Sequence, residues 1–334
     1  SKFKFGITGV YTRFGQDIPP GDQLYELYYF SGRENINLGL DYSYIWRNSN
    51  IFGEVARSQN GGMASITGLM TSPDRFLTFS VLHRYLSKDY QVFYAAAFQE
   101  SSRPQNEHGL FMGGEVKFSR KWSATGYVDL FSFPWLRYRV GAPSSGVEML
   151  AQGNYHPTKH SHIYVKFKQE NKEINGGDGY FDVLQPTIKR NYRIHASYPI
   201  SETVTLKTRA EYMTYNDGDE PQRDGFLIYQ DISYRKNGSP FTFSARYALF
   251  DTDTYDERLY AYENDVLYAF SIPAYYYKGS RYYLLVRLNA ARNLDFWVRL
   301  AHTNFSDRDV ISSGLNEING SGKTELKIQM RLKF

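Results

Sequence analysis

The segment 133–146 contains the residues whose types and spacing point most clearly to binding chemistry. Trp135, Arg137, Tyr138 and Arg139 stand close together within it. A planar guanidinium group beside an aromatic ring can hold a carboxylate, a phosphate or a sugar through bidentate hydrogen bonds and stacking. A second interpretation stays open, in which the two arginines pair with interior glutamates and the segment acts as a structural plug.

Three other groups of residues could hold a metal ion. His160 and His162 lie two positions apart, so on a strand they would point to the same side and could share a metal. They fall at an expected tight turn, and the sequence shows no evident third ligand. We therefore favour the interpretation that these histidines are exposed to solvent and bind no metal. The segments 216–220 and 251–257 gather oxygen ligands of the kind that calcium prefers, but neither matches the twelve-residue calcium loop. We therefore predict no metal site and no cofactor.

Covalent catalysis would need a nucleophile, a base and an orienting group that face one spot. No nucleophile-elbow motif occurs in the sequence. His83, His195 and His302 fall in separate expected strands, where an interior or interfacial position explains them more simply. The prediction is that the chain is not an enzyme.

The elements that position these residues are β-strands, because apolar and polar residues alternate along the chain. The last ten residues, 325–334, alternate strictly and end on Phe334. Helical spacing fits none of the alternating segments. We expect one all-β domain, 1–334, with about eighteen antiparallel strands. These strands are 2–13, 24–33, 35–47, 51–58, 62–72, 76–86, 90–98, 108–118, 121–132, 146–155, 160–171, 187–197, 203–215, 225–235, 239–250, 281–290, 294–304 and 324–334.

Sixteen or twenty strands are alternatives, because 24–33 could be a loop and 258–271 could add a hairpin. With eighteen strands, every long connection falls at one end of the sheet and both chain termini fall at the other. The long connections are 14–23, 99–107, 133–145, 172–186, 216–224, 251–280 and 305–323. This asymmetry is typical of transmembrane β-barrels of the bacterial outer membrane, which have periplasmic termini, short periplasmic turns and longer outer loops.

The composition agrees with a membrane barrel. Aromatic residues make up 17% of the chain, with 30 Tyr and 23 Phe, as expected for aromatic girdles at both membrane interfaces. The mean hydropathy of −0.53 shows that the chain is not hydrophobic overall, and no apolar run reaches the ~18 residues of a membrane helix.

The absence of Cys excludes a disulfide framework. A net charge of only +4 argues against a nucleic-acid-binding protein. The chain starts at Ser1 without a signal-type stretch, so we expect a processed or truncated form.

The polar faces of the expected strands carry charges of both signs. Each would cost ~2–4 kcal/mol near the membrane midplane, so they must face the interior. There they either line a water-filled passage or pair across the lumen. The residues are Lys166, Lys168, Arg193, Lys207, Arg209, Arg246, Arg287, Arg299, Lys327, Arg331, Glu54, Glu115, Glu148 and Glu211. For the segment 133–146, Pro134 and Pro143 should end the strand, and the loop should turn inward or cap the barrel.

Two resemblances extend this reading. The alternating segment that ends on Phe334 resembles the C-terminal signature of outer-membrane β-barrels, which implies that the barrel-assembly machinery reads it. The stretches 52–62, 87–107 and 133–146 together resemble the C-terminal barrel region of Bacteroidota envelope proteins that carry a helix-hairpin-helix segment near the N-terminus. This chain lacks the helix-hairpin-helix segment, so the DNA binding associated with that segment is not expected here. The resemblance implies no catalytic residues.

These observations predict a non-enzymatic integral protein of the bacterial outer membrane. Its role would be that of a porin-like pore, a receptor or a component of an envelope complex. Its expected partners are outer-membrane lipid, lipopolysaccharide and other envelope proteins, and nucleic acid is not among them. Two alternatives are kept: a lipid-modifying or hydrolytic outer-membrane enzyme, and a soluble all-β carbohydrate-binding protein.

Overall fold

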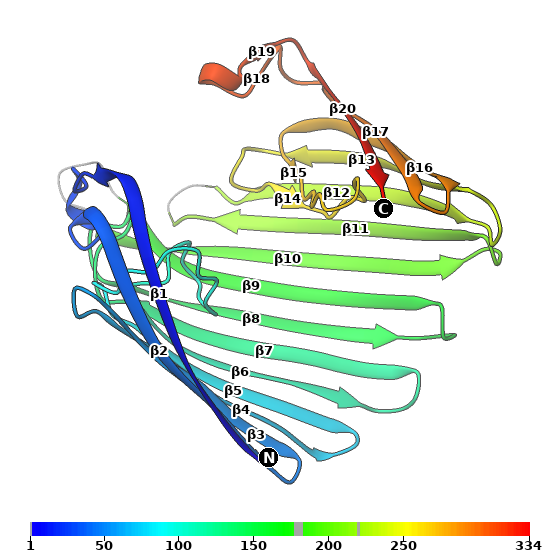
Figure 1. Cartoon of the computed structure of the whole chain (residues 1–334). Coiled ribbons are helices and arrows are strands. Elements are labelled where there is room, and N and C mark those ends of the chain that lie inside the picture. The colour runs from blue at the N-terminus through cyan, green and yellow to red at the C-terminus, as the bar shows by residue number, and fades with distance from the viewer. Residues whose placement is uncertain (1, 177–182, 219–220) are drawn as a thin grey trace.

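A computed structural model describes residues 2–176, 183–218 and 221–334. Its dominant element is one large antiparallel sheet of sixteen strands, which Figure 1 shows as a strongly curved wall. The strands are β1 (Phe3–Ile18), β2 (Gly32–Trp46), β3 (Ser49–Ser58), β4 (Met63–Asp74), β5 (Leu77–Leu86), β6 (Glu107–Lys117), β7 (Trp122–Phe133), β8 (Ser144–Tyr155), β9 (His162–Gly176), β10 (Val183–Pro199), β11 (Val204–Asn216), β12 (Arg223–Arg235), β13 (Phe241–Thr252), β16 (Lys278–Ala291), β17 (Leu294–Phe305) and β20 (Gly322–Leu332).

The topology is a meander, in which each strand pairs with the next one of the sheet along the chain. Within the described residues β1 pairs only with β2 and β20 only with β17, so the two edges of the sheet do not meet (Figure 1). The smaller elements lie in connections. They are the 3-10 helices η1 (Leu24–Glu26) and η2 (Gly314–Asn316) and the two-stranded pairs β14 (Leu259–Tyr260) with β15 (Ala274–Tyr275) and β18 (Val310–Ile311) with β19 (Ile318–Asn319). No helix of the described chain is both long enough and apolar enough to span a membrane.

The sheet confirms the predicted all-β fold with sixteen of the eighteen expected strands. The expected strands 24–33 and 90–98 were wrong, because their apolar residues pack inside connections instead. Phe30 and Phe93 meet edge to face, with ring centroids 4.9 Å apart. Tyr90 is buried in a cluster against the inner wall of β4 and β5. The possible hairpin at 258–271 corresponds to the pair β14 and β15, but its second strand lies beyond the expected range, at Ala274–Tyr275, and the pair is separate from the main sheet.

The two ends of the sheet differ as predicted. We call the end that carries the connections 19–31, 87–106, 134–143, 253–277 and 306–321 the loop end, and the opposite end the turn end. The strand order places both chain termini at the turn end, where strands are joined by short turns such as 47–48 and 292–293. The connection 59–62 between β3 and β4 also lies at the loop end, but it is as short as the turns of the opposite end.

The strands have one apolar face and one polar face. On β20, Leu326, Ile328, Met330 and Leu332 are exposed, and Ile328 is 70% accessible. The alternate residue Lys327 faces the other way and pairs with Asp265 of the connection 253–277 at 2.6 Å. The polar face is therefore the interior face, and the apolar face is the outer one.

The same outward apolar pattern recurs around the sheet. Exposed outer-face residues include Ile7, Leu38, Leu40, Val55, Met112, Val128, Val165, Ile194, Ile228, Ile232, Leu249, Leu284, Val298 and Leu300. Exposed aromatic rings flank this belt toward both ends. They include Trp46, Phe76, Phe118, Trp122, Tyr198 and Phe241 toward the turn end and Tyr11, Tyr212, Phe226, Tyr247 and Tyr282 toward the loop end. At the turn end, Trp122 stacks on Tyr155 with a centroid distance of 4.3 Å.

The connection 253–277 folds back onto the interior face, and we call it the inward loop. Its Leu259, Ala261 and Tyr275 are buried in one cluster with Met213, Leu227, Tyr229, Ala248 and Phe250 of β11 to β13. Burying these side chains against the wall stabilises the loop by the hydrophobic effect. The inward loop therefore occupies part of the space that the curved sheet encloses.

Candidate functional site

The loop end carries a pocket between the connections 19–31, 87–106 and 134–143, which we call the rim pocket. Its volume is about 280 Å³. The residues that line it include three of the four predicted binding residues, Trp135, Arg137 and Tyr138. The fourth, Arg139, does not line it. Its side chain is exposed and its φ of 62° is in the left-handed region.

Trp135 is held in place by a neighbouring connection. Its backbone N–H donates to Asn106 Oδ1 at 2.7 Å, and Asn106 Nδ2 donates to the Trp135 carbonyl at 2.9 Å. The Trp135 ring packs edge to face on Tyr28, with a centroid distance of 5.0 Å. The Lys88 ammonium lies 4.9 Å from the Trp135 ring and 4.4 Å from the Tyr28 ring. These contacts give the pocket a fixed aromatic wall with a cation over it.

Arg137 supplies a guanidinium group without a carboxylate partner. In the part of the chain that the structure describes, neither Arg137 nor Arg139 forms an ion pair within 4.0 Å. Arg137 lies 3.7 Å over the Phe133 ring and donates to Ser144 Oγ at 3.1 Å. Its Nε is buried without a hydrogen-bond acceptor. Burial lowers the pKa of Arg137, although Glu107, Glu100 and Glu173 partly offset this effect. Among the described residues Arg137 forms no ion pair that would fix the loop to a glutamate, so its guanidinium group keeps the capacity to bind an oxyanion.

We expect Arg137→Ala to weaken the binding of glucuronate, which combines a sugar ring with a carboxylate. The loss of a charge-assisted hydrogen bond should raise the dissociation constant about tenfold or more. The measurement is a titration of tryptophan fluorescence, with Trp135→Phe identifying the reporting residue. Arg139→Ala is the matched control because Arg139 lies outside the pocket. If Arg137→Ala and Arg139→Ala changed the dissociation constant equally, the rim pocket would not be the glucuronate-binding site.

A second polar region fixes the inward loop to the interior wall. Glu263 of the inward loop accepts hydrogen bonds from Arg281 Nε and Nη2, at 2.8 and 3.0 Å, and also pairs with Arg299. Tyr275 donates to the same carboxylate at 2.8 Å. Glu263 and Arg299 have no exposed side-chain surface. The predicted interior charges therefore do pair, but some pair between adjacent strands, as Arg193 of β10 does with Glu211 of β11, and others pair with the inward loop.

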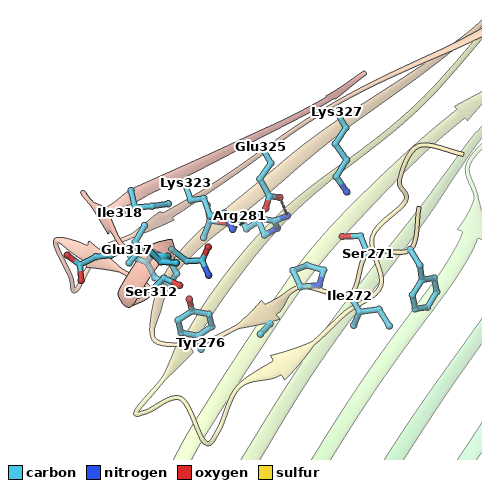
Figure 2. Close-up of a pocket in the computed structure, with 18 residues that line it drawn as sticks. Ser271, Ile272, Tyr276, Arg281, Ser312, Glu317, Ile318, Lys323, Glu325 and Lys327 are labelled. Carbon is cyan, nitrogen blue, oxygen red and sulfur yellow. Dashed lines mark hydrogen bonds and ion pairs between the residues drawn. The ribbon is translucent and has the colours of Figure 1, made fainter. Parts of the chain in front are cut away.

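A cavity of about 750 Å³ lies between the inward loop, the connection 306–321 and the interior face of β20. Figure 2 shows Arg281, Glu325 and Lys327 on one side and Ser271, Ile272 and Tyr276 on the other. Most of the charged groups here are already paired, since Arg281 contacts Glu325 at 3.2 Å and Lys327 contacts Asp265 at 2.6 Å. The cavity is thus water-accessible space beside the inward loop.

The candidate metal ligands are not assembled by the fold. His156 of the turn between β8 and β9 stacks on His162, the first residue of β9, with ring centroids 4.4 Å apart, and His160 is exposed. In the predicted acidic segments, Asp217 and Glu257 both pair with Arg223. Positions 219 and 220 lie outside the described residues.

A cluster that the sequence did not indicate brings together Glu100, Glu148 and Glu170, whose ligand atoms lie within 4.8 Å of one another. Lys172 pairs with Glu100 at 2.6 Å and with Glu170 at 3.0 Å. Lys168 pairs with Glu148 at 2.8 Å. Two lysine ammonium groups therefore partly compensate the three carboxylates.

The exposed apolar belt shows which environment surrounds the outer face of the sheet. Apolar surface of this extent, flanked by aromatic rings and backed by a charged interior, is stable only against hydrocarbon. The sheet spans a membrane. Antiparallel sheets with this alternation and with loops at one end occur in bacterial outer membranes, so the chain is an outer-membrane β-barrel protein with its loop end toward the medium.

Comparisons with known proteins found similarity among solved structures. No known family's sequence profile matches the chain, and no curated protein matches it in sequence. Among solved structures, the chain is similar to a loop L8 deletion mutant of OmpT, an outer membrane protein of Vibrio cholerae, with 12% identity over 99% of each chain and a TM-score of 0.44. It is also similar to OccK5 (OpdH) of Pseudomonas aeruginosa, with 8% identity, 99% and 96% coverage and a TM-score of 0.37. At this similarity the membrane assignment rests on the apolar belt.

Proposed function

We propose that this protein is a non-enzymatic outer-membrane pore whose passage is narrowed by the inward loop. The carrying observation is that Glu263 and Asp265 of that loop bind Arg281, Arg299 and Lys327 of the interior wall. A loop fixed in this way restricts the lumen without filling it, because water-accessible cavities remain beside it. Lipid and lipopolysaccharide are the proposed surroundings of the outer face.

The non-enzymatic part of the proposal rests on the sequence, and two histidines that a hydrolase could use as a base have other neighbours in the structure. Among the described residues, no serine hydroxyl is hydrogen-bonded to a histidine ring. His302 bonds Thr324 at 2.8 Å, and His195 stacks on Tyr164 at 5.0 Å.

A receptor role, alone or within an envelope complex, is the second candidate. The rim pocket supports it, because Arg137, Lys88 and Trp135 line the pocket and Arg137 has no ion-pair partner among the described residues. The three stretches that resemble Bacteroidota envelope proteins converge near this rim: Gly62 lies against Asp89, and Asn106 bonds Trp135. We keep kinship with those proteins as part of this proposal.

Single-channel recording on protein refolded into planar bilayers tests the pore. The wild type should give small, steady conductance steps. Glu263→Gln should give larger or noisier steps, because Arg281 and Arg299 lose the charge that holds the inward loop. Glu202→Gln, at an exposed turn-end position, is the control and should behave like the wild type. A complete lack of steps in wild type and Glu263→Gln would contradict the pore.

A further inference from the structure

The interior face of β9, β10 and β11 contains a pocket with an excess of positive charge, which we call the basic wall pocket. Its volume is about 280 Å³, and Arg258, Leu259 and Tyr260 of the inward loop close it. Five cationic side chains line it against two carboxylates, those of Glu170 and Glu211. The cations are Lys166, Lys168, Lys189, Arg193 and Arg258.

The strand register places like charges side by side in this pocket. Lys166 of β9 lies directly opposite Arg193 of β10. Like charges at directly opposite positions destabilise an antiparallel pair. Arg193 has one carboxylate partner, Glu211, with Nε to Oε2 at 2.9 Å and Nη2 to Oε1 at 2.8 Å. Arg209 pairs with the same Glu211, so one negative charge serves two guanidinium groups.

Two of the remaining cations have a carboxylate partner, since Lys168 pairs with Glu148 at 2.8 Å and Arg258 lies 4.0 Å from Asp256. The other two, Lys166 and Lys189, are not neutralised by an ion pair within the described chain. The Lys189 ammonium donates to the backbone carbonyl of Asp256 at 3.2 Å, a contact that adds no negative charge. Arg258 donates to the Tyr260 hydroxyl at 2.6 Å. Glu170 pairs with Lys172, which does not line the pocket.

We propose that the basic wall pocket binds a small oxyanion, a carboxylate or phosphate group, on its way through the lumen. A cleft lined by one sign of charge between low-dielectric walls concentrates ions of the opposite sign. Lysine and arginine rings give pores their anion selectivity. The volume suits a small solute rather than a polymer. This inference rests on the proposed pore but can be tested apart from it.

The first test is ion selectivity, measured as the reversal potential under a KCl gradient across the bilayer. The wild type should prefer chloride, and Lys166→Gln with Lys189→Gln should lower the chloride-to-potassium permeability ratio several-fold. Lys159→Gln with Lys236→Gln removes the same charge from exposed turn positions and should leave the ratio unchanged. Lys166→Arg keeps the charge and should keep the preference. A conducting wild type without chloride preference would overturn the anion site and leave the pore standing.

The second test needs no conduction. Inorganic phosphate should raise the melting temperature of the detergent-solubilised wild type, and the Lys166→Gln, Lys189→Gln variant should lose most of this shift. Arg137→Ala should retain it, which separates the lumen from the rim pocket. Phosphate stabilisation without conductance would overturn the pore but support the anion site. Equal shifts in wild type and the lysine variant would overturn the site.

Discussion

Arg84→Met is expected to destabilise the folded protein by about 3–5 kcal/mol, because it leaves two carboxylates without their counterion in the interior. Arg84 is completely buried on β5. Its Nε lies 2.6 Å from Glu107 Oε1 and its Nη1 lies 2.8 Å from Asp129 Oδ1. Methionine preserves most of the side-chain length, so the effect reports on charge rather than on a cavity. The measurement is a urea titration in lipid vesicles.

Two variants separate charge from volume. Arg235→Met changes an exposed arginine that forms no ion pair among the described residues, and it should alter the free energy of unfolding by less than about 0.5 kcal/mol. Adding Glu107→Gln and Asp129→Asn to Arg84→Met should recover a large part of the loss, since the uncompensated charges are then gone. An equal cost for Arg84→Met and Arg235→Met would show that the buried ion pairs contribute little.

Glu107 also explains why the connection 87–106 takes a defined course. Its carboxylate accepts hydrogen bonds from the backbone N–H groups of Glu100, at 2.9 and 3.1 Å, and of Ser101 at 3.0 Å. Arg84 therefore fixes the Glu107 carboxylate, and Glu107 in turn fixes the connection 87–106. This connection lines the rim pocket. We expect the Arg84→Met variant to lose order at the rim as well as stability.

The strands were predictable because their alternation is local. A strand with one lipid face and one interior face repeats every two residues, and the segment 325–334 displays this repeat without reference to any other residue. The failures at 24–33 and 90–98 have the opposite origin. Their residues contact distant partners: the Phe30 and Phe93 rings meet at 4.9 Å, and the Gln91 carbonyl accepts hydrogen bonds from Asn35 at 2.9 Å and Asn37 at 2.8 Å. Alternation alone does not distinguish such contacts from a lipid face.

The rim pocket was predictable in part. The types and proximity of Trp135, Arg137 and Tyr138 singled out their segment, and Pro134 indicated where the strand ends. Their partners Lys88 and Asn106 come from another connection, and no local spacing relates them to Trp135. The same holds for the pair of Arg84 with Asp129 and for Glu263, whose carboxylate meets Arg281 and Arg299 only because the inward loop folds back.

Ile328→Arg is expected to destabilise the protein by about 2–4 kcal/mol in lipid vesicles, because it places a charge on the lipid face near the middle of β20. Ile328 lies opposite Val298 of β17, which is also on the outer face. The neighbouring position provides the control: Gln329 lies opposite the buried Trp297, so Gln329→Arg adds the same side chain to the interior, where Asp295 already binds Arg331.

The free energy of unfolding, measured by urea titration of both variants, should therefore differ sharply between two adjacent residues. The expected order follows from the two-residue repeat alone, since shifting the register of β20 by one residue would exchange the faces of Ile328 and Gln329. A larger loss for Gln329→Arg would mean that the register is shifted. Equal losses would mean that the apolar face does not meet hydrocarbon, and the membrane assignment would fail with it.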